Sequence, residues 1–244
     1  MKILALDTAT ENCSAAVWLD GGLIQREMEV ERGHAELILP MIDELLAQAG
    51  IRLTALDAIA FGRGPGSFTG VRLAASVTQG LAFGADLPVV PVSDLRAVAQ
   101  RASNRQADPS AAPRRMLVCN DARMHEVYWG CFEQGADGLM TPVGLEKVSK
   151  PSDVYVPDGW TAVRAAGRGF AAYGELEQRL ADVLANVDNN VLPAAGEIAV
   201  LALPEVHAGR TVAPEHAVPV YVRDDVARPQ AAPPDVASTP PRGP

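Results

Sequence analysis

One pattern occurs twice in the chain. An apolar run at residues 2–7 ends in Asp7, and a polar turn then leads into a second apolar run. The same order returns at residues 116–132, where the first run ends in Asp121. The two copies match in pattern rather than in identity, and a repeated supersecondary unit indicates duplication. We therefore predict an α/β protein with two duplicated subdomains, each built from a β-β-β-α unit with a mixed sheet.

Apolar periodicity assigns the individual elements. Apolar residues at i, i+4 and i+8 over residues 34–49 indicate a helix, with Gly50 at its C-terminal cap. Pro40 inside it is expected to kink the helix or to mark a late start. In the first half we predict strands at 2–7, 14–19, 23–30, 56–61 and 89–92, and helices at 34–49, 69–83 and 94–102. In the second half we predict strands at 116–121 and 127–132, helices at 172–187 and 197–203, and an extended segment at 219–223.

The 244 residues suffice for one large domain or two small ones. Residues 103–114 are polar and contain prolines, which is typical of a linker. From about Arg228 onward Pro, Ala and Ser dominate, and such a segment cannot form a core. We therefore predict a first subdomain at residues 1–102, a linker at 103–114, a second subdomain at 115–226 and a disordered tail at 227–244.

The charge balance is acidic, with 21 Lys and Arg against 30 Asp and Glu and a formal net charge of −9. Proteins that bind nucleic acid on their own need basic residues to displace counterions from phosphates. Any contact with nucleic acid must therefore be local or supplied by a partner. The cysteines, Cys13, Cys119 and Cys131, are scattered without metal-ligand spacing, which favours buried thiols in a reducing compartment.

The first apolar run is interrupted by Asp7 and Glu11 before a signal peptide could form. No apolar run reaches the roughly 20 residues that span a bilayer. We therefore expect a cytoplasmic protein without membrane contact.

Common catalytic motifs are absent, since the sequence contains neither a Walker-type phosphate loop nor HExxH. The four histidines are scattered, so we predict no metal site and assign no catalytic residue. Asp7 and Asp121 are the candidates for chemistry, because each ends the first strand of a repeat. A carboxylate at that place can hold a magnesium–nucleotide through waters. The alternative is an aspartate that caps the turn by accepting hydrogen bonds from nearby backbone N–H groups.

A second candidate is the glycine-rich segment 62–70, which leads from a strand into a helix. Glycines let the backbone approach a partner closely, and the start of a helix offers N–H groups to an anion. The alternative is a tight strand-to-helix connection without a ligand. In the following helix, Gly70, Ala74 and Ala75 form a small-residue face that suits close helix–helix approach across a subunit interface, or ordinary internal packing.

Four segments of the chain closely resemble the bacterial TsaB family, also called YeaZ. They are residues 3–11, the Gly-Arg-Gly-Pro-Gly-Ser-Phe-Thr-Gly-Val-Arg stretch at 62–72, residues 121–129 and residues 219–223. The resemblance spans about residues 1–226 in the right order, and the glycine stretch is highly specific. His125 departs from the small residue that is commoner in the family's Asp-Ala-Arg-Met-Gly-Glu turn.

The resemblance implies the actin-like, sugar-kinase-like ATPase (ASKHA) fold. It also implies a subunit of the complex that makes threonylcarbamoyladenosine in tRNA. In that complex TsaD carries the metal and transfers the threonylcarbamoyl group, and TsaE is a small ATPase that binds the TsaB–TsaD pair. TsaB has no accepted catalytic activity, forms homodimers alone and exchanges that interface for TsaD. Contact with tRNA is then indirect, and this chain requires no cofactor. ADP or ATP at the subunit interface is a candidate ligand.

The resemblance also places the partner interface on the helices at 34–49 and 69–83. Where TsaD has two metal-ligand histidines, this chain has the segment that begins Ser93-Asp94-Leu95, so the resemblance implies no metal. Two alternatives are an autonomous actin-like-fold ATPase or small-molecule kinase, motivated by Asp7, Asp121 and the glycine segment, and a metalloprotease. The expected interface residues are His34, Leu37, Ile38, Met41, Phe68, Gly70, Arg72, Ala74, Ala75 and Thr78.

Overall fold

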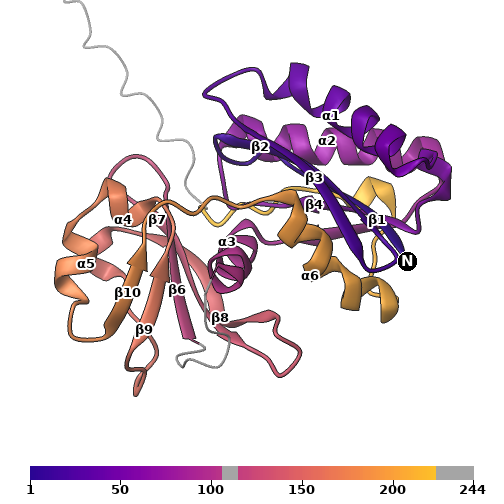
Figure 1. The fold of residues 1–244 in the computed structure, drawn as a ribbon. Helices are drawn as coiled ribbons and strands as arrows, with labels where there is room; N and C mark the ends of the chain where they lie inside the picture. The colour runs from indigo at the N-terminus through magenta and orange to yellow at the C-terminus, as the bar shows by residue number, and fades with distance from the viewer. Residues whose placement is uncertain (106–114, 224–244) are drawn as a thin grey trace, which may run out of the picture.

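The computed structural model describes residues 1–105 and 115–223. It contains two five-stranded mixed sheets with the same strand order, the order β3-β2-β1-β4-β5 in the first and β8-β7-β6-β9-β10 in the second (Figure 1). In each sheet the central strand pairs antiparallel with the second strand and parallel with the fourth. The predicted duplication and the actin-like α/β fold class are confirmed. The strands are β1 (Lys2–Asp7), β2 (Asn12–Leu19), β3 (Gly22–Glu29), β4 (Ala58–Gly62), β5 (Val89–Val92), β6 (Arg115–Asp121), β7 (Val127–Gln134), β8 (Met140–Ser149), β9 (Val163–Ala166) and β10 (Leu184–Asp188).

The helices α1 (His34–Ala49) and α2 (Phe68–Ala85) cover one face of the first sheet (Figure 1). α1 has the predicted bounds because its buried residues recur at helical spacing and Gly50 ends it in the left-handed region, at φ 66°. It begins at His34 and continues through the exposed Pro40, so the expectation of a late start was wrong. Its buried residues are Ile38, Met41, Ile42 and Leu45.

The opposite face of the first sheet is covered by α6 (Ala195–His207), which follows the second sheet in the chain. Ile198 and Leu201 of α6 pack with Ile3 in one apolar cluster. The prediction that the second subdomain extends to residue 226 was therefore wrong, since the chain returns to the first sheet after β10. The periodicity of an apolar helix shows that it is buried, but not which of two equivalent sheets buries it.

The helix α3 (Asp94–Asn104) lies between the two sheets. Its Leu95 and Val98 pack against the second sheet, while Ala97 contacts the core of the first. The first two residues of the predicted linker 103–114 belong to this helix, and positions 106–114 lie outside the described residues. The predicted tail at 227–244 also lies outside them.

The region predicted as one helix at 172–187 holds two short helices and a strand. α4 (Gly169–Ala172) ends there, α5 (Glu175–Arg179) follows, and β10 closes the region. That prediction was wrong because Leu184 and Val187 of β10, and Val183 directly before it, pack against the second core, and their spacing in the sequence imitates that of a helix. Three single 3₁₀ turns complete the described structure: η1 (Leu53–Ala55), η2 (Pro151–Asp153) and η3 (Pro214–His216).

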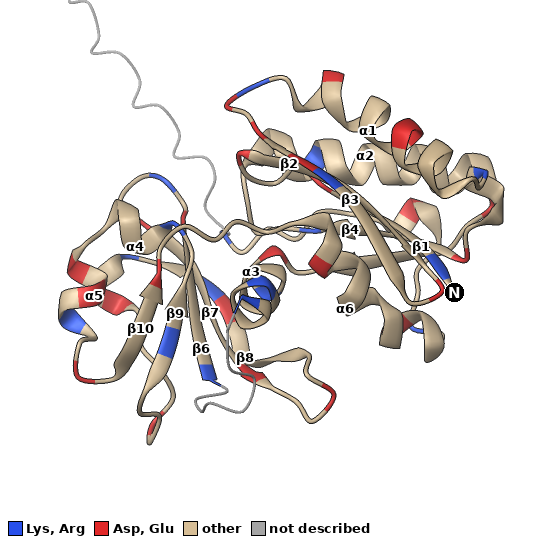
Figure 2. Ribbon diagram, viewed as in Figure 1, with Lys and Arg blue, Asp and Glu red and all other residues tan. Residues whose placement is uncertain are grey.

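Charged side chains of both signs are interspersed over the two subdomains (Figure 2). The three cysteines are buried and free, as predicted. Among the helices of the described ranges, none is both long and apolar enough to cross a membrane.

Candidate functional site

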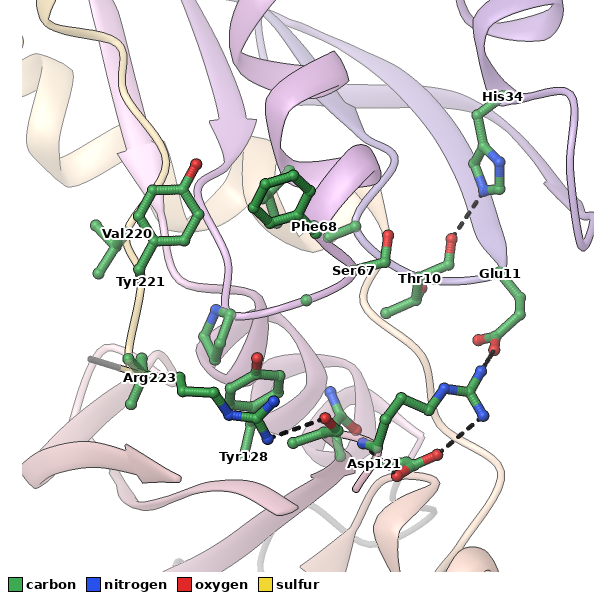
Figure 3. A pocket seen from close by; sticks show the side chains of 18 of the residues that line it. Thr10, Glu11, His34, Ser67, Phe68, Asp121, Tyr128, Val220, Tyr221 and Arg223 are labelled. Carbon is green, nitrogen blue, oxygen red and sulfur yellow. Dashed lines mark hydrogen bonds and ion pairs between the residues drawn. The ribbon is translucent and has the colours of Figure 1, made fainter. Parts of the chain in front are cut away.

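A pocket of about 380 Å³ lies where the two subdomains meet (Figure 3). The glycine segment and the β1–β2 turn form one wall, and the β6–β7 turn forms the opposite wall. The C-terminal segment closes a third side. The lining residues are 9–11, Glu31, His34, 65–68, Val71, 120–123, Tyr128 and 220–223.

The glycine segment packs on the chain's own β1–β2 turn. Thr8 donates its Oγ1 hydroxyl to the Gly70 carbonyl at 2.7 Å, and the Ser67 N–H donates to the Ala9 carbonyl at 2.8 Å. A Cβ at Gly70 would overlap the Thr8 carbonyl oxygen, and one at Gly66 would lie 2.6 Å from the Ala9 carbonyl oxygen. These glycines are therefore required by a tight strand-to-helix connection, which is the alternative that the sequence left open.

Asp7 is fully buried behind this wall and does not line the pocket. Its Oδ1 accepts a hydrogen bond from the Ala9 N–H at 2.9 Å, which is the turn-capping arrangement. The Asp7 carboxyl lies beside that of Asp94, and the Asp94 carboxyl accepts the Gly64 N–H. Burial raises the pKa of Asp7 to about 6, and burial together with the neighbouring Asp7 raises the pKa of Asp94 well above its usual range.

Asp121 occupies the equivalent place in the second subdomain but faces the pocket. Its Oδ1 accepts hydrogen bonds from the Arg123 N–H at 2.8 Å and from the Tyr173 hydroxyl at 2.9 Å. Its Oδ2 lies 3.2 Å from the Arg123 guanidinium. The two candidate aspartates therefore both cap turns, and the structure does not bring them together at one site.

Polar contacts link the two subdomains around the pocket (Figure 3). The Arg123 guanidinium lies 3.8 Å from the Glu11 carboxylate of the first subdomain. The Val220 N–H donates to the Arg63 carbonyl at 2.8 Å, and Arg223 donates to the carbonyl of Ala122 at 3.2 Å and pairs with Glu126. The C-terminal segment is thus held by both subdomains.

The turn at the pocket rim has an unusual backbone. Arg123, Met124 and His125 have φ values of 62°, 55° and 59°, in the left-handed region that favours glycine. His125 is therefore held in a backbone conformation that glycine adopts more readily than a residue with a Cβ. Its ring contacts Tyr173 edge-on at 5.1 Å and lies 3.6 Å from the Glu175 carboxylate.

The residues expected at a partner interface divide into two groups. The residues of the first group are buried in the chain's own core, so they cannot contact a partner. The prediction that they form the interface was therefore wrong. The members of this group are Ile38, Met41, Gly70, Ala74, Ala75 and Thr78. The second group reaches the surface in part or fully, and consists of His34, Leu37, Phe68 and Arg72.

Sequence reasoning missed the outer residues of the same helices. Leu39 is 46 % exposed and Phe83 is 80 % exposed. Gly80 and Gly84 on α2 have no atom within 4 Å of the position that a Cβ would occupy. The sequence did hold a signal for Leu39, because this apolar residue directly follows Ile38 and so lies next to the apolar positions that α1 buries.

Comparison with known proteins gives concordant results. The model of the family described as "TsaD: tRNA N6-adenosine threonylcarbamoyltransferase" matches residues 21–230. The tRNA threonylcarbamoyladenosine biosynthesis protein TsaB of Escherichia coli is 40 % identical over 232 residues, which cover 93 % of this chain and 96 % of the relative. TsaB of Haemophilus influenzae is 37 % identical over 236 residues, covering 93 % and 95 %. The chain belongs to the TsaB family.

A solved structure of YeaZ from Pseudomonas aeruginosa agrees with this membership. It is 43 % identical, has a TM-score of 0.83, and covers 90 % of this chain and 99 % of that chain. The TsaB likeness therefore extends over both subdomains. In the described part of this TsaB chain, no three His, Cys, Asp or Glu side chains gather as a metal site.

Proposed function

We propose that the chain is a non-catalytic subunit in tRNA threonylcarbamoyladenosine biosynthesis, and that it binds and supports a metal-bearing TsaD transferase. The relatives' names support the pathway, and the match to the TsaD family model supports kinship with the transferase. The acidic net charge of −9 supports a subunit that leaves most tRNA contact to its partners.

The outer surface of α1 and α2 is the observation that carries this proposal. Leu39 and Phe83 expose large apolar side chains there, and the open space over Gly80 and Gly84 admits the backbone of another helix. TsaD occupies this surface in the working complex, TsaE joins the pair, and a second copy of the chain occupies the surface when TsaD is absent.

The test is threonylcarbamoyl transfer to tRNA in a mixture of TsaD, TsaE and the enzyme that makes the adenylate. Transfer is expected to require this chain, and the chain alone is expected neither to modify tRNA nor to hydrolyse ATP. Equal transfer without the chain contradicts the proposal. ATP hydrolysis by the chain alone favours the autonomous ATPase or kinase instead.

Two glycine substitutions locate the surface. Gly80→Arg fills open space on α2, so the chain should stay folded but lose TsaD binding and transfer. Gly174→Arg is the matched control, because Gly174 is an exposed glycine with open space in the second subdomain. Equal loss of binding in both variants would place the interface elsewhere.

A further inference from the structure

One carboxylate of the second sheet reaches across to the first subdomain. Glu146 belongs to β8, and its carboxylate accepts a hydrogen bond from the hydroxyl of Ser93. Ser93 directly follows β5, is only 6 % exposed, and caps α3 by accepting the Arg96 N–H at 3.1 Å. Glu146 therefore ties a strand of the second sheet to the point where the first sheet continues into α3.

Two guanidinium groups of the first half of the chain act on this carboxylate. Burial raises the pKa of Glu146, whereas the Ser93 hydrogen bond and the positive charges of Arg63 and Arg96 lower it. Arg63 directly follows β4, and its Nε is buried without a hydrogen-bond partner among the described residues. Glu146 thus supplies a negative charge to a half-buried cation of the first subdomain, and removing one member of such a pair is costly.

An irregularity of β8 lies at this contact. Where β7 has the single residue Gly130 between two regular pairs, β8 has the three residues 144–146. A bulge of this kind redirects side chains, and Gly144 within it has a φ of 82°. A Cβ at Gly130 would lie 3.5 Å from Cγ of Glu146. The strand therefore departs from regular pairing at the residue that contacts the first subdomain.

The start of β8 is held by α3 as well. The Met140 N–H donates to Oε1 of Gln100 at 2.8 Å, and the Met140 carbonyl accepts from Nε of Arg96 at 2.6 Å. Ala97 of the same helix packs in the core of the first subdomain. A rotation of one subdomain against the other would have to break contacts at both ends of this arrangement.

Other ion pairs between the subdomains are more exposed. Arg168 of the second subdomain lies 2.7 Å from the Glu29 carboxylate and 3.5 Å from that of Glu11. The Glu29 side chain is 60 % exposed. Exposed ion pairs contribute little, because water and salt screen them. The half-buried Glu146 contact is therefore the stronger restraint.

We propose that Glu146 fixes the angle between the two subdomains, so that the chain is a rigid scaffold rather than a hinged one. A partner then meets the α1–α2 surface and the second subdomain in one arrangement, and binding does not have to order them first. This inference concerns the chain alone and goes beyond the proposed function, since it holds whether or not TsaD binds.

Electron–electron double resonance between two spin labels measures the angle. His207→Cys on α6 and Asp182→Cys before β10 place the labels at exposed positions, one in each subdomain and both away from α1 and α2. The natural cysteines are buried, so the labels react at the introduced ones. The parent should give one narrow distribution of label distances. Two separated distances, or one broad distribution, overturn the proposal.

Glu146→Ala in the labelled chain should broaden and shift this distribution, because it removes the Ser93 contact and leaves Arg63 without its counter-charge. Glu29→Ala is the matched control, since it removes an exposed ion pair between the same subdomains and should keep the narrow distribution. Circular dichroism verifies that both variants are folded. An unchanged distribution in Glu146→Ala, or equal broadening in both variants, overturns the assignment to Glu146.

Salt tests the same point without a substitution, should Glu146→Ala fail to fold. Sodium chloride at about 1 M screens exposed ion pairs almost completely but half-buried ones much less. The label distances in the unsubstituted background should therefore stay narrow in salt. Broadening in salt would mean that the exposed pairs of Arg168 set the angle, and it would contradict the role of Glu146.

Discussion

The carboxyl groups of Asp7 and Asp94 meet in the core, although Asp7 ends β1 and Asp94 begins α3. Both are fully buried, and a Cβ at Gly62 would lie 2.6 Å from one oxygen of Asp7 and still closer to one of Asp94. Among the described residues, neither Asp7 Oδ2 nor Asp94 Oδ1 accepts a hydrogen bond. Two adjacent buried carboxyls cannot both ionise easily, so Asp94 holds a proton that its carboxyl shares with that of Asp7.

The first prediction concerns the pH dependence of stability. Because the native pKa of Asp7 is raised to about 6 and that of Asp94 well above its usual range, the folded state holds protons that the unfolded state releases near pH 4. The stabilisation by these protons is complete when the pH is below the pKa values of the two carboxyls in the unfolded chain. It is lost as the pH rises through their pKa values in the folded protein. The free energy of unfolding, measured with urea, should therefore carry a falling contribution from this pair between about pH 4 and pH 8.

Asp94→Asn isolates this contribution. An amide at position 94 can accept the Gly64 N–H and donate to Asp7, as the protonated carboxyl does. The variant should be at least as stable as the parent at pH 8. Its free energy of unfolding should decrease much less than that of the parent between pH 5 and pH 8. Asp182→Asn, at an exposed site, should keep the parent profile. An unchanged profile in Asp94→Asn would contradict the shared proton.

The second prediction compares two glycines of α2. Gly70→Ala places a Cβ against the Thr8 carbonyl and should lower the free energy of unfolding by about 2–3 kcal/mol. Gly80→Ala enters open space in the helix interior and should raise it by about 0.5–1 kcal/mol, since alanine favours the helix. Urea unfolding of both variants measures the difference, and equal effects would contradict the close approach at Gly70.

Local signals predicted the first sheet and its outer helices well. α1 and β5 have the predicted bounds, because periodicity and the Gly50 cap act within a few residues. α3 begins at the predicted place because Ser93 accepts the Arg96 N–H as an N-terminal cap. The placement of α6 on the first sheet depends on contacts with Ile3 and other distant residues, which no local pattern contains.

The site was predicted less completely for the same reason. Asp7 and Asp121 hold equivalent places in the repeat, but Asp94 from a third element determines that only Asp7 is enclosed beside another carboxyl. The unpaired amide of Asn120 is invisible in sequence, where it is one residue of an apolar run. Burial and pairing are set by tertiary contacts, so these properties required the structure.

The third prediction separates core from surface on α2. Ala74 is fully buried, so Ala74→Arg forces an unpaired charge into the core and should lower the free energy of unfolding by about 3 kcal/mol or more. Ser76 is exposed two residues further on, and Ser76→Arg should change the value by no more than about 0.5 kcal/mol. Circular dichroism with urea measures both, and a stable Ala74→Arg variant would mean that this side of α2 is free. If the prediction holds, Ser76→Arg can report partner binding by the folded chain, whereas Ala74→Arg cannot.

The fourth prediction concerns the left-handed backbone at His125. At φ 59° a residue with a Cβ is strained by roughly 1–2 kcal/mol, whereas glycine is not. His125→Gly and His125→Ala both remove the contacts with Tyr173 and Glu175, so their difference reports the backbone alone. The glycine variant should be the more stable by about 1 kcal/mol in urea unfolding. At Ala47, an exposed position in α1, the sign should reverse, and Ala47→Gly should destabilise by about 1 kcal/mol. A His125→Ala variant as stable as His125→Gly would show that the turn relaxes to negative φ once the imidazole contacts are removed.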